Sequence, residues 1–495
     1  MSIKVKEFDD DTIRSIFGHE AAEDDDIQRL KQFYFKNTTY SRLRANHSLR
    51  LLIGHKGIGK SAMLAIAVQE DLVNKQLAIS LRPDDIDEIA SGGDGINAQI
   101  RAWKDGFRRI ICRKVFEFFS LNKCINQNEH ASTWVAMATD FGKTIAQMMK
   151  SKGIVLEASK GAVLEEFCRN NVIRVYIDDL DRGWDATKDS VTRMSAMLNA
   201  VRDISREFKN IRFVVSLRSD VYYLVRTSDE STDKLESACI WFSWTNHEIL
   251  AMLIKRLKTY FNLPCQTDAE LIEMDQAQLA IDLSRVMDNR FHGRGMWENI
   301  PMYRMLMTLI RRRPRDLVKL CSLAARSAYE NGRNSIETED FDRIFNRYSQ
   351  DRLQDTINEY KSELSNIQEL LENMKPSQKQ RKPRTVSGHK FVFNGAEMLA
   401  KINAICQSHR FKFFGEGADA DAKEIRNFLY KIGFVTARKE VQSGEIIRHF
   451  FEDHNYISSR YADYGCSWEI HPAYRWALSP YDKDITSEID LLNEM

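Results

Sequence analysis

The chain has 495 residues, of which 43% are hydrophobic and 29% charged, with a net charge of +1. These values predict two to four globular domains, and they exclude a global electrostatic attraction to nucleic acid, so any such site has to be a local patch. No run of about 18 apolar residues or signal-peptide core is present, and the eight cysteines form no C-x-x-C pair. We therefore expect a cytoplasmic protein that makes no membrane contact and has neither a zinc site nor a disulfide framework.

The first half of the chain alternates between strand-like and helical patterns. Residues 1–48 predict a helical lead-in, and residues 49–244 predict a P-loop ATPase core with a helical insertion at about 99–150. The expected strands are 50–54, 77–81, 172–177, 211–217 and 238–243, and the expected insertion helices are 107–119 and 135–149. This alternation favours an α/β fold in which a parallel sheet carries helices on both faces.

The most specific motif lies between the first strand and the helix after it. Residues 54–61 match G-x-x-x-x-G-K-[ST] in full. The glycines allow the backbone to wrap a triphosphate, the lysine is placed to reach the β- and γ-phosphates, and the serine is placed to bind Mg²⁺. We therefore predict an ATP and Mg²⁺ site formed by Gly54, His55, Lys56, Gly57, Ile58, Gly59, Lys60, Ser61 and Ala62.

A second motif follows the third strand, where an apolar run at 173–177 ends in acidic residues, as in a Walker B strand. Asp178 is placed to hold the Mg²⁺, directly or through water. Asp179 is placed to act as a base or to position the attacking water. A buried strand with an exposed acidic turn gives the same pattern, but the complete P-loop upstream favours the metal site.

Two further groups are candidates for contact with the γ-phosphate. The fourth strand ends in polar residues, so Ser216 and Arg218 are candidates, with an ordinary ion pair as the alternative for Arg218. In the run 311–316, Pro314 favours the first turn of a helix. This would place Arg315 at a helix start facing inward, whereas the alternative is a basic surface cluster.

The second half of the chain is mainly helical. Residues 245–370 have helical periodicity and predict a lid domain. Residues 371–390 form a basic, proline-containing linker, whose charges at 375–390 suit either a solvated linker or an arm that contacts nucleic acid.

The C-terminal part predicts a winged-helix-like α+β module at 391–480, followed by an acidic tail at 481–495. Its pattern is a helix that ends at Gly433 and a hairpin formed by residues 448–453 and 466–470. Arg460 and Tyr461 would lie at the hairpin tip. Such modules bind DNA or protein, so both partner classes stay open.

Taken together, these motifs resemble the KAP and STAND branch of P-loop ATPases, relatives of the AAA+ proteins. The string Ile-Asp-Asp-Leu-Asp-Arg at 177–182 is the most specific part of the resemblance. The elements Phe-Gly-His-Glu-Ala-Ala-Glu-Asp at 17–24 and Ile-His-Pro at 470–472 resemble bacterial members found in anti-phage defence or DNA-maintenance gene islands. The resemblance implies an ATP-driven, oligomerising switch with a helical lid.

The resemblance also implies roles for three arginines. Arg218 matches the sensor arginine after the fourth strand, Arg315 matches the second sensor in the lid, and Arg182 is the candidate to reach the ATP site of a neighbouring subunit. Asp179 departs from the glutamate of the AAA+ branch, which implies slow or assembly-dependent hydrolysis. The insertion also lacks the membrane helices that KAP proteins often carry.

Three functional hypotheses follow. The first is a homo-oligomeric defence ATPase that controls a separate effector protein, because no toxic catalytic motif is recognisable in this chain. The second is a DNA-binding ATPase for repair or replication that uses the basic linker and the C-terminal module. The third is a signalling scaffold that binds nucleotide without turnover.

Overall fold

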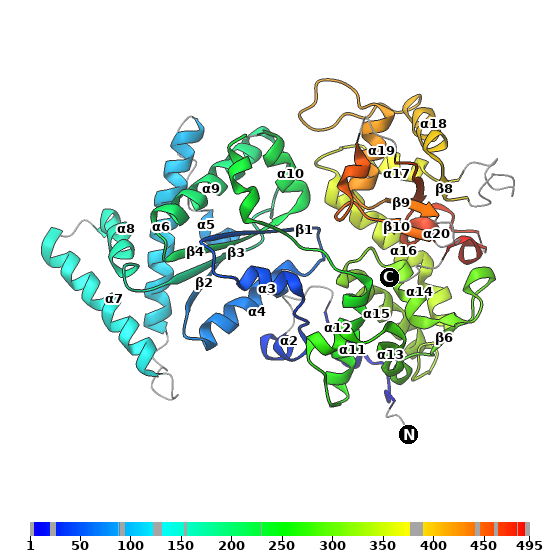
Figure 1. Ribbon diagram of the computed structural model, residues 1–495, viewed down its shortest axis with the longest axis horizontal. Coiled ribbons are helices and arrows are strands. Elements are labelled where there is room, and N and C mark those ends of the chain that lie inside the picture. The colour runs from blue at the N-terminus through cyan, green and yellow to red at the C-terminus, as the bar shows by residue number, and fades with distance from the viewer. Residues whose placement is uncertain are drawn as a thin grey trace. The chain divides into compact units, whose positions relative to one another are not determined.

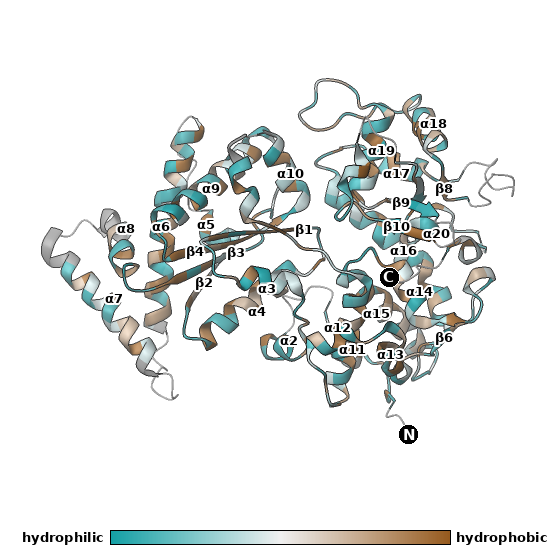
Figure 2. Cartoon of the chain, viewed as in Figure 1, coloured by the Kyte–Doolittle hydropathy of each residue, from teal (hydrophilic) through white to brown (hydrophobic). Residues whose placement is uncertain are grey.

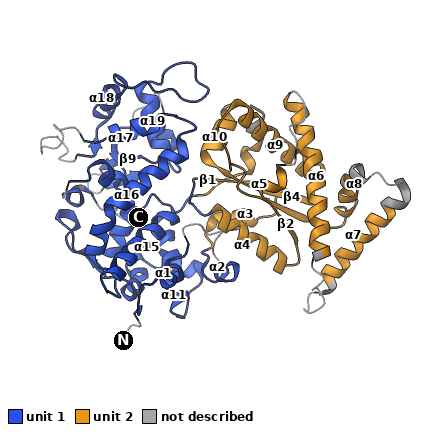
Figure 3. Ribbon diagram, turned by 180° about the vertical axis from the view of Figure 1, so that it is seen from behind, with its two compact units in different colours: residues 1–35, 56–59, 243–495 blue, residues 36–55, 60–242 orange. Residues whose placement is uncertain are grey.

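The computed structural model describes residues 4–19, 26–87, 89, 95–121, 131–152, 156–228, 230–376, 390–440, 446–459, 464–482 and 484–490. The chain forms two compact units (Figure 3). The sheet unit comprises residues 36–55 and 60–242. The helical unit comprises residues 1–35, 56–59 and 243–495.

The sheet unit is built on a five-stranded sheet with the order β2-β3-β4-β1-β5. Every neighbouring pair in it is parallel. The strands are β1 (Leu49–Gly54), β2 (Leu77–Leu81), β3 (Ile173–Ile177), β4 (Ile211–Arg218) and β5 (Cys239–Trp241). The five strands expected from the sequence are therefore confirmed, and the core has the α/β P-loop NTPase fold.

Helices cover this sheet on both faces (Figure 1). One face packs its alternate apolar residues, such as Leu51, Phe213 and Val175, into a core shared with α6 and α9. The opposite face carries Tyr176, whose hydroxyl donates to Asp71 of α4. Figure 2 shows hydrophobic colouring along these strands, as expected for a parallel sheet that is covered on both sides.

The helices of the sheet unit include the predicted insertion. The predicted helices at 107–119 and 135–149 lie within α6 and α7, and α6 packs on α8 and α9. The bounds are α3 (Thr38–Arg44), α4 (Lys60–Val73), α5 (Pro83–Ile86), α6 (Ile96–Leu121), α7 (Ala131–Lys152), α8 (Leu156–Phe167), α9 (Lys188–Glu207), α10 (Ser219–Ser228) and the 3₁₀ helix η3 (Glu230–Ala238).

The helical unit begins with α1 (Asp10–Phe17) and α2 (Ile27–Phe33), and continues at residue 243. Its longest helices, α15 and α16, pack against each other. The remaining helices and short strands up to residue 373 are α11 (Asn246–Tyr260), α12 (Asp268–Glu273), α13 (Gln276–Leu279), η4 (Ala280–Arg285), β6 (Arg290–Phe291), η5 (Gly295–Trp297), β7 (Ile300–Pro301), α14 (Met302–Leu309), α15 (Pro314–Glu330), α16 (Thr338–Tyr360) and α17 (Ile367–Asn373).

The C-terminal part of the helical unit holds a four-stranded sheet with the order β10-β9-β11-β8. Its elements are β8 (Val392–Phe393), α18 (Gly395–Cys406), α19 (Ala422–Lys431), β9 (Val435–Glu440), β10 (Ile446–His449), η6 (Asn455–Ser458), β11 (Ser467–Ile470), η7 (Pro472–Tyr474), α20 (Arg475–Leu478) and η8 (Ile485–Glu488). The predicted hairpin is wrong, because β9 pairs with both β10 and β11 and separates them. The sequence pattern missed β9, whose outer residues are charged. Arg460 and Tyr461 lie outside the described residues.

In the part of the chain that the structure describes, no helix combines the length and the apolar composition needed to cross a membrane.

Candidate functional site

The predicted P-loop has the expected strand–loop–helix geometry. β1 ends at Gly54 and α4 begins at Lys60. Gly57 and Gly59 have φ values of 79° and 100°, a region that residues with a Cβ rarely adopt. The Nζ of Lys60 donates to the carbonyl oxygens of Gly54 at 2.9 Å and His55 at 3.1 Å. The lysine ammonium group is thus folded back over the start of the loop.

The remaining P-loop residues are either anchored in the fold or at the start of α4. The ring of His55 is buried, and its Nδ1 lies 3.1 Å from Oγ of Ser219. Ser61 is half-buried in the first turn of α4, and Ala62 is buried behind it. The sequence assigned both residues to the site, and Ser61 has the hydroxyl oxygen suited to Mg²⁺.

The acidic pair lies at the same edge of the sheet as the P-loop. Gly54 is opposite Arg218 in the β1–β4 register, and Ile177 is opposite Val215 in the β3–β4 register. Since all three strands are parallel, the P-loop and Asp178 follow strand ends at one edge. Asp178 is half-buried, and its N–H donates to the carbonyl of Leu81. This backbone contact fixes the acid where β3 ends.

Asp179 lies in the turn directly after this position. It is exposed and has a φ of 60°, uncommon for a residue other than glycine. The carbonyl of Asp179 accepts a hydrogen bond from the N–H of Arg182 at 3.0 Å, which closes the turn. The turn therefore presents the second acid to solvent and leaves Arg182 exposed beside it.

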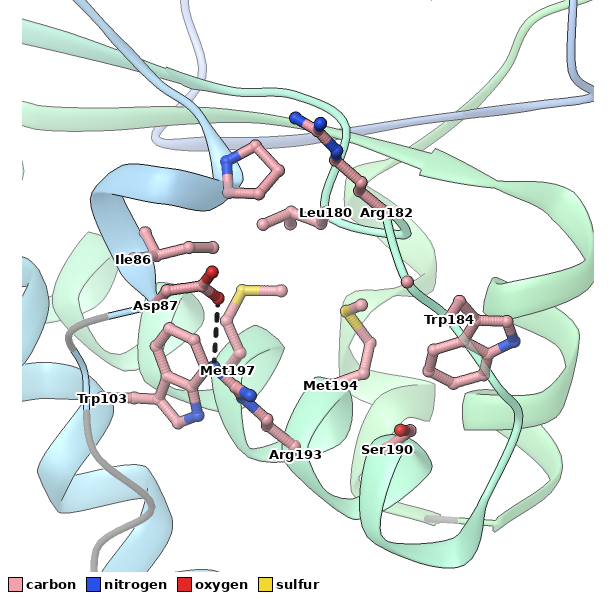
Figure 4. Close-up of a pocket in the computed structure, with 12 residues that line it drawn as sticks. Ile86, Asp87, Trp103, Leu180, Arg182, Trp184, Ser190, Arg193, Met194 and Met197 are labelled. Atoms are coloured by element: carbon pink, nitrogen blue, oxygen red, sulfur yellow. Dashed lines mark ion pairs between the residues drawn. The ribbon is translucent and has the colours of Figure 1, made fainter.

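The turn after β3 borders a small pocket of about 130 Å³ (Figure 4). Arg193 of α9 lies 3.9 Å from the carboxylate of Asp87 and above the ring of Trp103, at 5.6 Å. The lining residues are Pro83, Ile86, Asp87, Trp103, Leu180, Arg182, Gly183, Trp184, Ser190, Arg193, Met194 and Met197. Arg182 thus borders a pocket whose other walls come from α5, α6 and α9.

Arg218 forms ion pairs at the carboxyl end of β4. Its guanidinium contacts Asp220 at 2.6 Å and Asp181 at 3.3 Å. Its side chain is 16% exposed. The ion pair anticipated as the alternative for Arg218 is therefore present, and it ties β4 to the turn after β3. Ser216, two residues earlier, is buried.

Arg315 lies against the P-loop. Residues 56–59 belong to the helical unit, where the N–H of Arg315 donates to the carbonyl of Gly57 at 3.4 Å. A Cβ on Gly57 would lie 3.1 Å from the Cβ and Cδ of Arg315, so this glycine also permits the close approach. Pro314 occupies the first turn of α15, as the sequence predicted. The prediction that Arg315 starts a helix is thus confirmed.

A further residue at the P-loop, Glu359 of α16, was missed by the sequence analysis. Its Oε1 accepts the N–H of Lys56 at 3.0 Å, and its Oε2 accepts Nη1 of Arg313 at 2.8 Å. Arg313 also donates to the carbonyl of Lys56 at 3.3 Å, and the indole of Trp244 donates to the carbonyl of Ile58 at 2.8 Å. Burial acts to lower the pKa of Arg313, but Glu359, together with Tyr360 and Asp316, raises that pKa. Both the N–H and the carbonyl oxygen of Lys56 are therefore bound by side chains of the helical unit.

The rest of the 311–315 run has a structural role, and the surface-cluster alternative is wrong for its buried members. The guanidinium of Arg311 donates two hydrogen bonds to Asp316, at 2.7 and 2.9 Å, and a third to Thr356. Arg352 of α16 contacts the same carboxylate at 2.6 Å. Burial acts to raise the pKa of Asp316, but the two arginines hold it well below the usual range. The side chain of Arg311 thus forms a buried ion pair with Asp316 inside the helical unit.

Two of the predicted partner-contact segments, the basic linker and the 460–461 loop tip, lie wholly or mostly outside the described residues. Residues 377–389 contain most of the basic linker, and they lie outside the described residues.

Among the residues that are described, no group of three or more His, Cys, Asp or Glu side chains forms a metal-binding cluster. The oxygen donors Ser61 and Asp178 suit Mg²⁺, which keeps several of its waters and needs few protein ligands.

Three comparisons connect the chain to known proteins. Residues 248–357 match the FunZ-associated C-terminal helical domain. The chain is 20% identical to the putative transposon gamma-delta 80.3 kDa protein of Escherichia coli K12, over 96% of this chain and 70% of that protein. The matched range runs from α11 into α16, so it includes Arg315 and ends two residues before Glu359.

Two solved structures from Aeropyrum pernix are also similar at low levels. The first is the ORC2 protein in its ADPNP–ADP complexes, at 12% identity and a TM-score of 0.35, covering 86% of this chain and 89% of that one. The second is the ORC1 protein in complex with DNA, at 12% identity and a TM-score of 0.29, covering 96% and 95%.

Proposed function

We propose that this protein is a Mg²⁺-dependent ATPase. One observation carries the proposal: the strand register brings the P-loop and the acidic pair to the same edge of the sheet, although more than a hundred residues separate them. A triphosphate needs backbone N–H groups and a lysine, and its metal needs oxygen ligands. This edge supplies both, through Gly54–Ser61 and Asp178.

In this proposal each residue has a defined role. Lys60 leaves its two carbonyl acceptors to bind the β- and γ-phosphates. Ser61 and Asp178 hold Mg²⁺, which would neutralise charge on the phosphate oxygens. Asp179 accepts the proton of the attacking water or orients that water. Arg315, next to Gly57, is placed to contact phosphate as the lid sensor, and Arg218 holds the end of β4 through its ion pairs.

The acidic pair provides the test of hydrolysis. Asp178→Ala is expected to weaken both ATP binding and turnover, because a metal ligand is lost. Asp179→Asn is expected to keep ATP binding while lowering turnover by roughly 10²–10⁴-fold, because an amide cannot accept a proton. Binding is measured with a fluorescent ATP analogue and turnover by phosphate release. Normal turnover by Asp179→Asn would assign the base elsewhere, and normal binding and turnover by Asp178→Ala would remove the metal site.

We further propose that the ATPase acts as a homo-oligomeric switch or scaffold that controls a separate effector protein in bacterial anti-phage defence. The support is the resemblance to KAP and STAND ATPases, together with the exposure of Arg182 beside the acidic turn. In such an assembly Arg182 would contact the γ-phosphate of a neighbouring subunit.

Assembly predicts concentration-dependent activity. An arginine supplied by a neighbour is worth roughly 10³–10⁵ in rate, so specific activity is expected to rise steeply with protein concentration. Mixing Lys60→Ala with Arg182→Ala subunits should restore part of the activity, because each defect falls in a different composite site. The oligomer is rejected if sedimentation with ATP and Mg²⁺ shows only a 57.5 kDa species whose specific activity does not depend on concentration.

A DNA-binding ATPase is the second candidate. The name of the Escherichia coli relative refers to a transposon, a DNA element, and the sheet unit carries a basic surface that is described below. Stimulation of ATP turnover by DNA would favour this candidate over the effector-controlling switch. Nucleotide binding without any turnover would instead favour a signalling scaffold.

A further inference from the structure

A group of basic side chains gathers at the amino-terminal edge of the five-stranded sheet, the edge opposite the P-loop. Ser48 precedes β1 and accepts a hydrogen bond from Phe213 of β4, which brings the 46–48 loop next to Arg212. The last turn of α9 adds Arg206, and the turn after the helix adds Lys209. These residues border an open pocket of about 440 Å³, lined by Asn46, His47, Ser48, Ser205, Arg206, Lys209 and Arg212. We call it the basic pocket.

The positive charge continues from the basic pocket across one face of the sheet. The register places Arg50 of β1 opposite Val214 and Arg174 of β3 opposite Arg212. Partners in a parallel register, and residues two apart in a strand, share a face. Arg50, Arg174 and Arg212 therefore lie on one face, and Arg42 of α3 is close enough to Arg50 to repel it.

Of these cations, only Arg174 forms an ion pair within the described part of the chain. It contacts the buried carboxylate of Asp71, as Arg44 also does. No described carboxylate lies within ion-pair distance of the others, Arg42, Arg50, Arg206, Lys209 and Arg212. The neighbouring acid Glu207 is instead bound to Lys104 and Arg108.

Two of the cations are held in the fold at an electrostatic cost. Arg50 and Arg212 are half-buried, and the buried Nε of Arg50 has no hydrogen-bond partner among the described residues. Burial and then Arg42 lower the pKa of Arg50, and burial and then Arg174 lower that of Arg212. An anion at this surface would relieve the repulsion and supply the missing acceptor.

We propose that the basic pocket and the adjoining Arg42, Arg50 and Arg212 bind the sugar–phosphate backbone of a nucleic-acid duplex. The cations extend over α3, β1, β4 and the end of α9. A ligand that contacts all of them needs a series of phosphates, because a single small anion reaches only a few of them. Asparagine, serine, arginine and lysine are the usual donors to phosphate. Among the described residues, no Phe, Tyr or Trp lines the pocket, and its only ring is the imidazole of His47, whereas single-strand sites stack successive bases on aromatic rings.

This site is separate from the proposed ATP site. Arg212 and Arg218 are six positions apart in one strand, which corresponds to about 20 Å. Charge changes at the basic pocket are therefore expected to leave ATP binding intact. Conversely, Lys60→Ala should bind duplex as the wild type does, so failure of one proposal can be told from failure of the other.

The test is duplex binding by the full chain, measured by fluorescence anisotropy with a labelled short DNA duplex at about 50 to 200 mM salt. The double variant Arg206→Glu/Lys209→Glu is expected to bind roughly 10- to 100-fold more weakly, with a salt slope shallower by about 2. The milder Arg212→Gln should lose about tenfold, with a slope shallower by about 1. ATP binding serves as the measure of correct folding.

The matched control is Arg101→Glu/Lys188→Glu, which makes the same charge change at exposed residues of α6 and α9 in the same unit. It is expected to keep the wild-type affinity and salt slope. The proposal is overturned if the pocket variants behave like this control, which would assign binding to other segments such as the basic linker. It is also overturned if inorganic phosphate competes as well as duplex, or if a single strand binds more tightly than duplex.

Discussion

Replacing Lys60 by alanine is expected to weaken ATP binding by roughly 30- to 1000-fold and to abolish measurable turnover. The side chain supplies the ammonium group of the P-loop, and its charge-assisted bonds to phosphate are worth about 2–4 kcal/mol in total. In the structure this ammonium donates to two backbone carbonyls at the start of the loop, those of Gly54 and His55. The fold should therefore survive its removal.

The control for Lys60→Ala is Lys188→Ala, which removes an exposed lysine at the start of α9 in the same unit. Isothermal titration with ATP and Mg²⁺ gives the affinity, and circular dichroism reports the fold. If Lys60→Ala bound and hydrolysed ATP within about twofold of the wild type, the phosphate site would be wrongly assigned.

The second large effect concerns stability. Asp316→Ala is expected to lower the free energy of unfolding of the helical unit by about 3–5 kcal/mol, because it leaves Arg311 and Arg352 buried without their shared carboxylate. Both arginine side chains and Asp316 are 5% exposed or less. The free energy of unfolding is obtained from the first transition of a urea titration, which is monitored by fluorescence.

The chain offers a matched control for this prediction. Lys319–Asp351 also joins α15 to α16, at 3.5 Å, but the side chain of Asp351 is 37% exposed. Asp351→Ala is therefore expected to cost less than about 1 kcal/mol. Equal effects of the two substitutions would show that the buried network does not stabilise the unit.

The same carboxylate predicts a dependence on pH. The pKa of Asp316 is lowered from its unfolded value of 3.8, so its contribution is complete above that pH and is lost as the pH falls below it. Asp316→Ala should therefore remove part of the acid destabilisation that the wild type shows in this range.

The sheet and the P-loop could be predicted because their signals are local. Apolar runs such as 173–177 are dictated by burial on both faces of a parallel sheet, and the glycines at 57 and 59 are required by their positive φ values. Arg315 could be placed at a helix start because Pro314 favours the first turn.

The remaining features depend on contacts that sequence spacing does not encode. Glu359 lies three hundred positions after the P-loop, and its only local signal is a polar stripe with Arg352 and Thr356 on the buried face of α16. β9 was missed because its outer half is charged. The basic pocket joins the 46–48 loop to residues 205–212, which only the pairing of β1 with β4 brings together.

The Glu359 carboxylate and a bound phosphate would compete for the same hydrogen-bond donor of the P-loop, the N–H of Lys56. In the proposed ATP site, a phosphate oxygen that accepted the Lys56 N–H would take this donor from the buried Glu359 carboxylate, and the lost hydrogen bond would reduce the net binding free energy of the nucleotide. Tyr360, the next residue, packs edge-on against Phe428 in the core of the C-terminal part. Two adjacent residues of α16 therefore contact the P-loop and α19: Glu359 accepts the Lys56 N–H, and Tyr360 packs on Phe428. A substitution at residue 359 would change nucleotide affinity without touching the nucleotide.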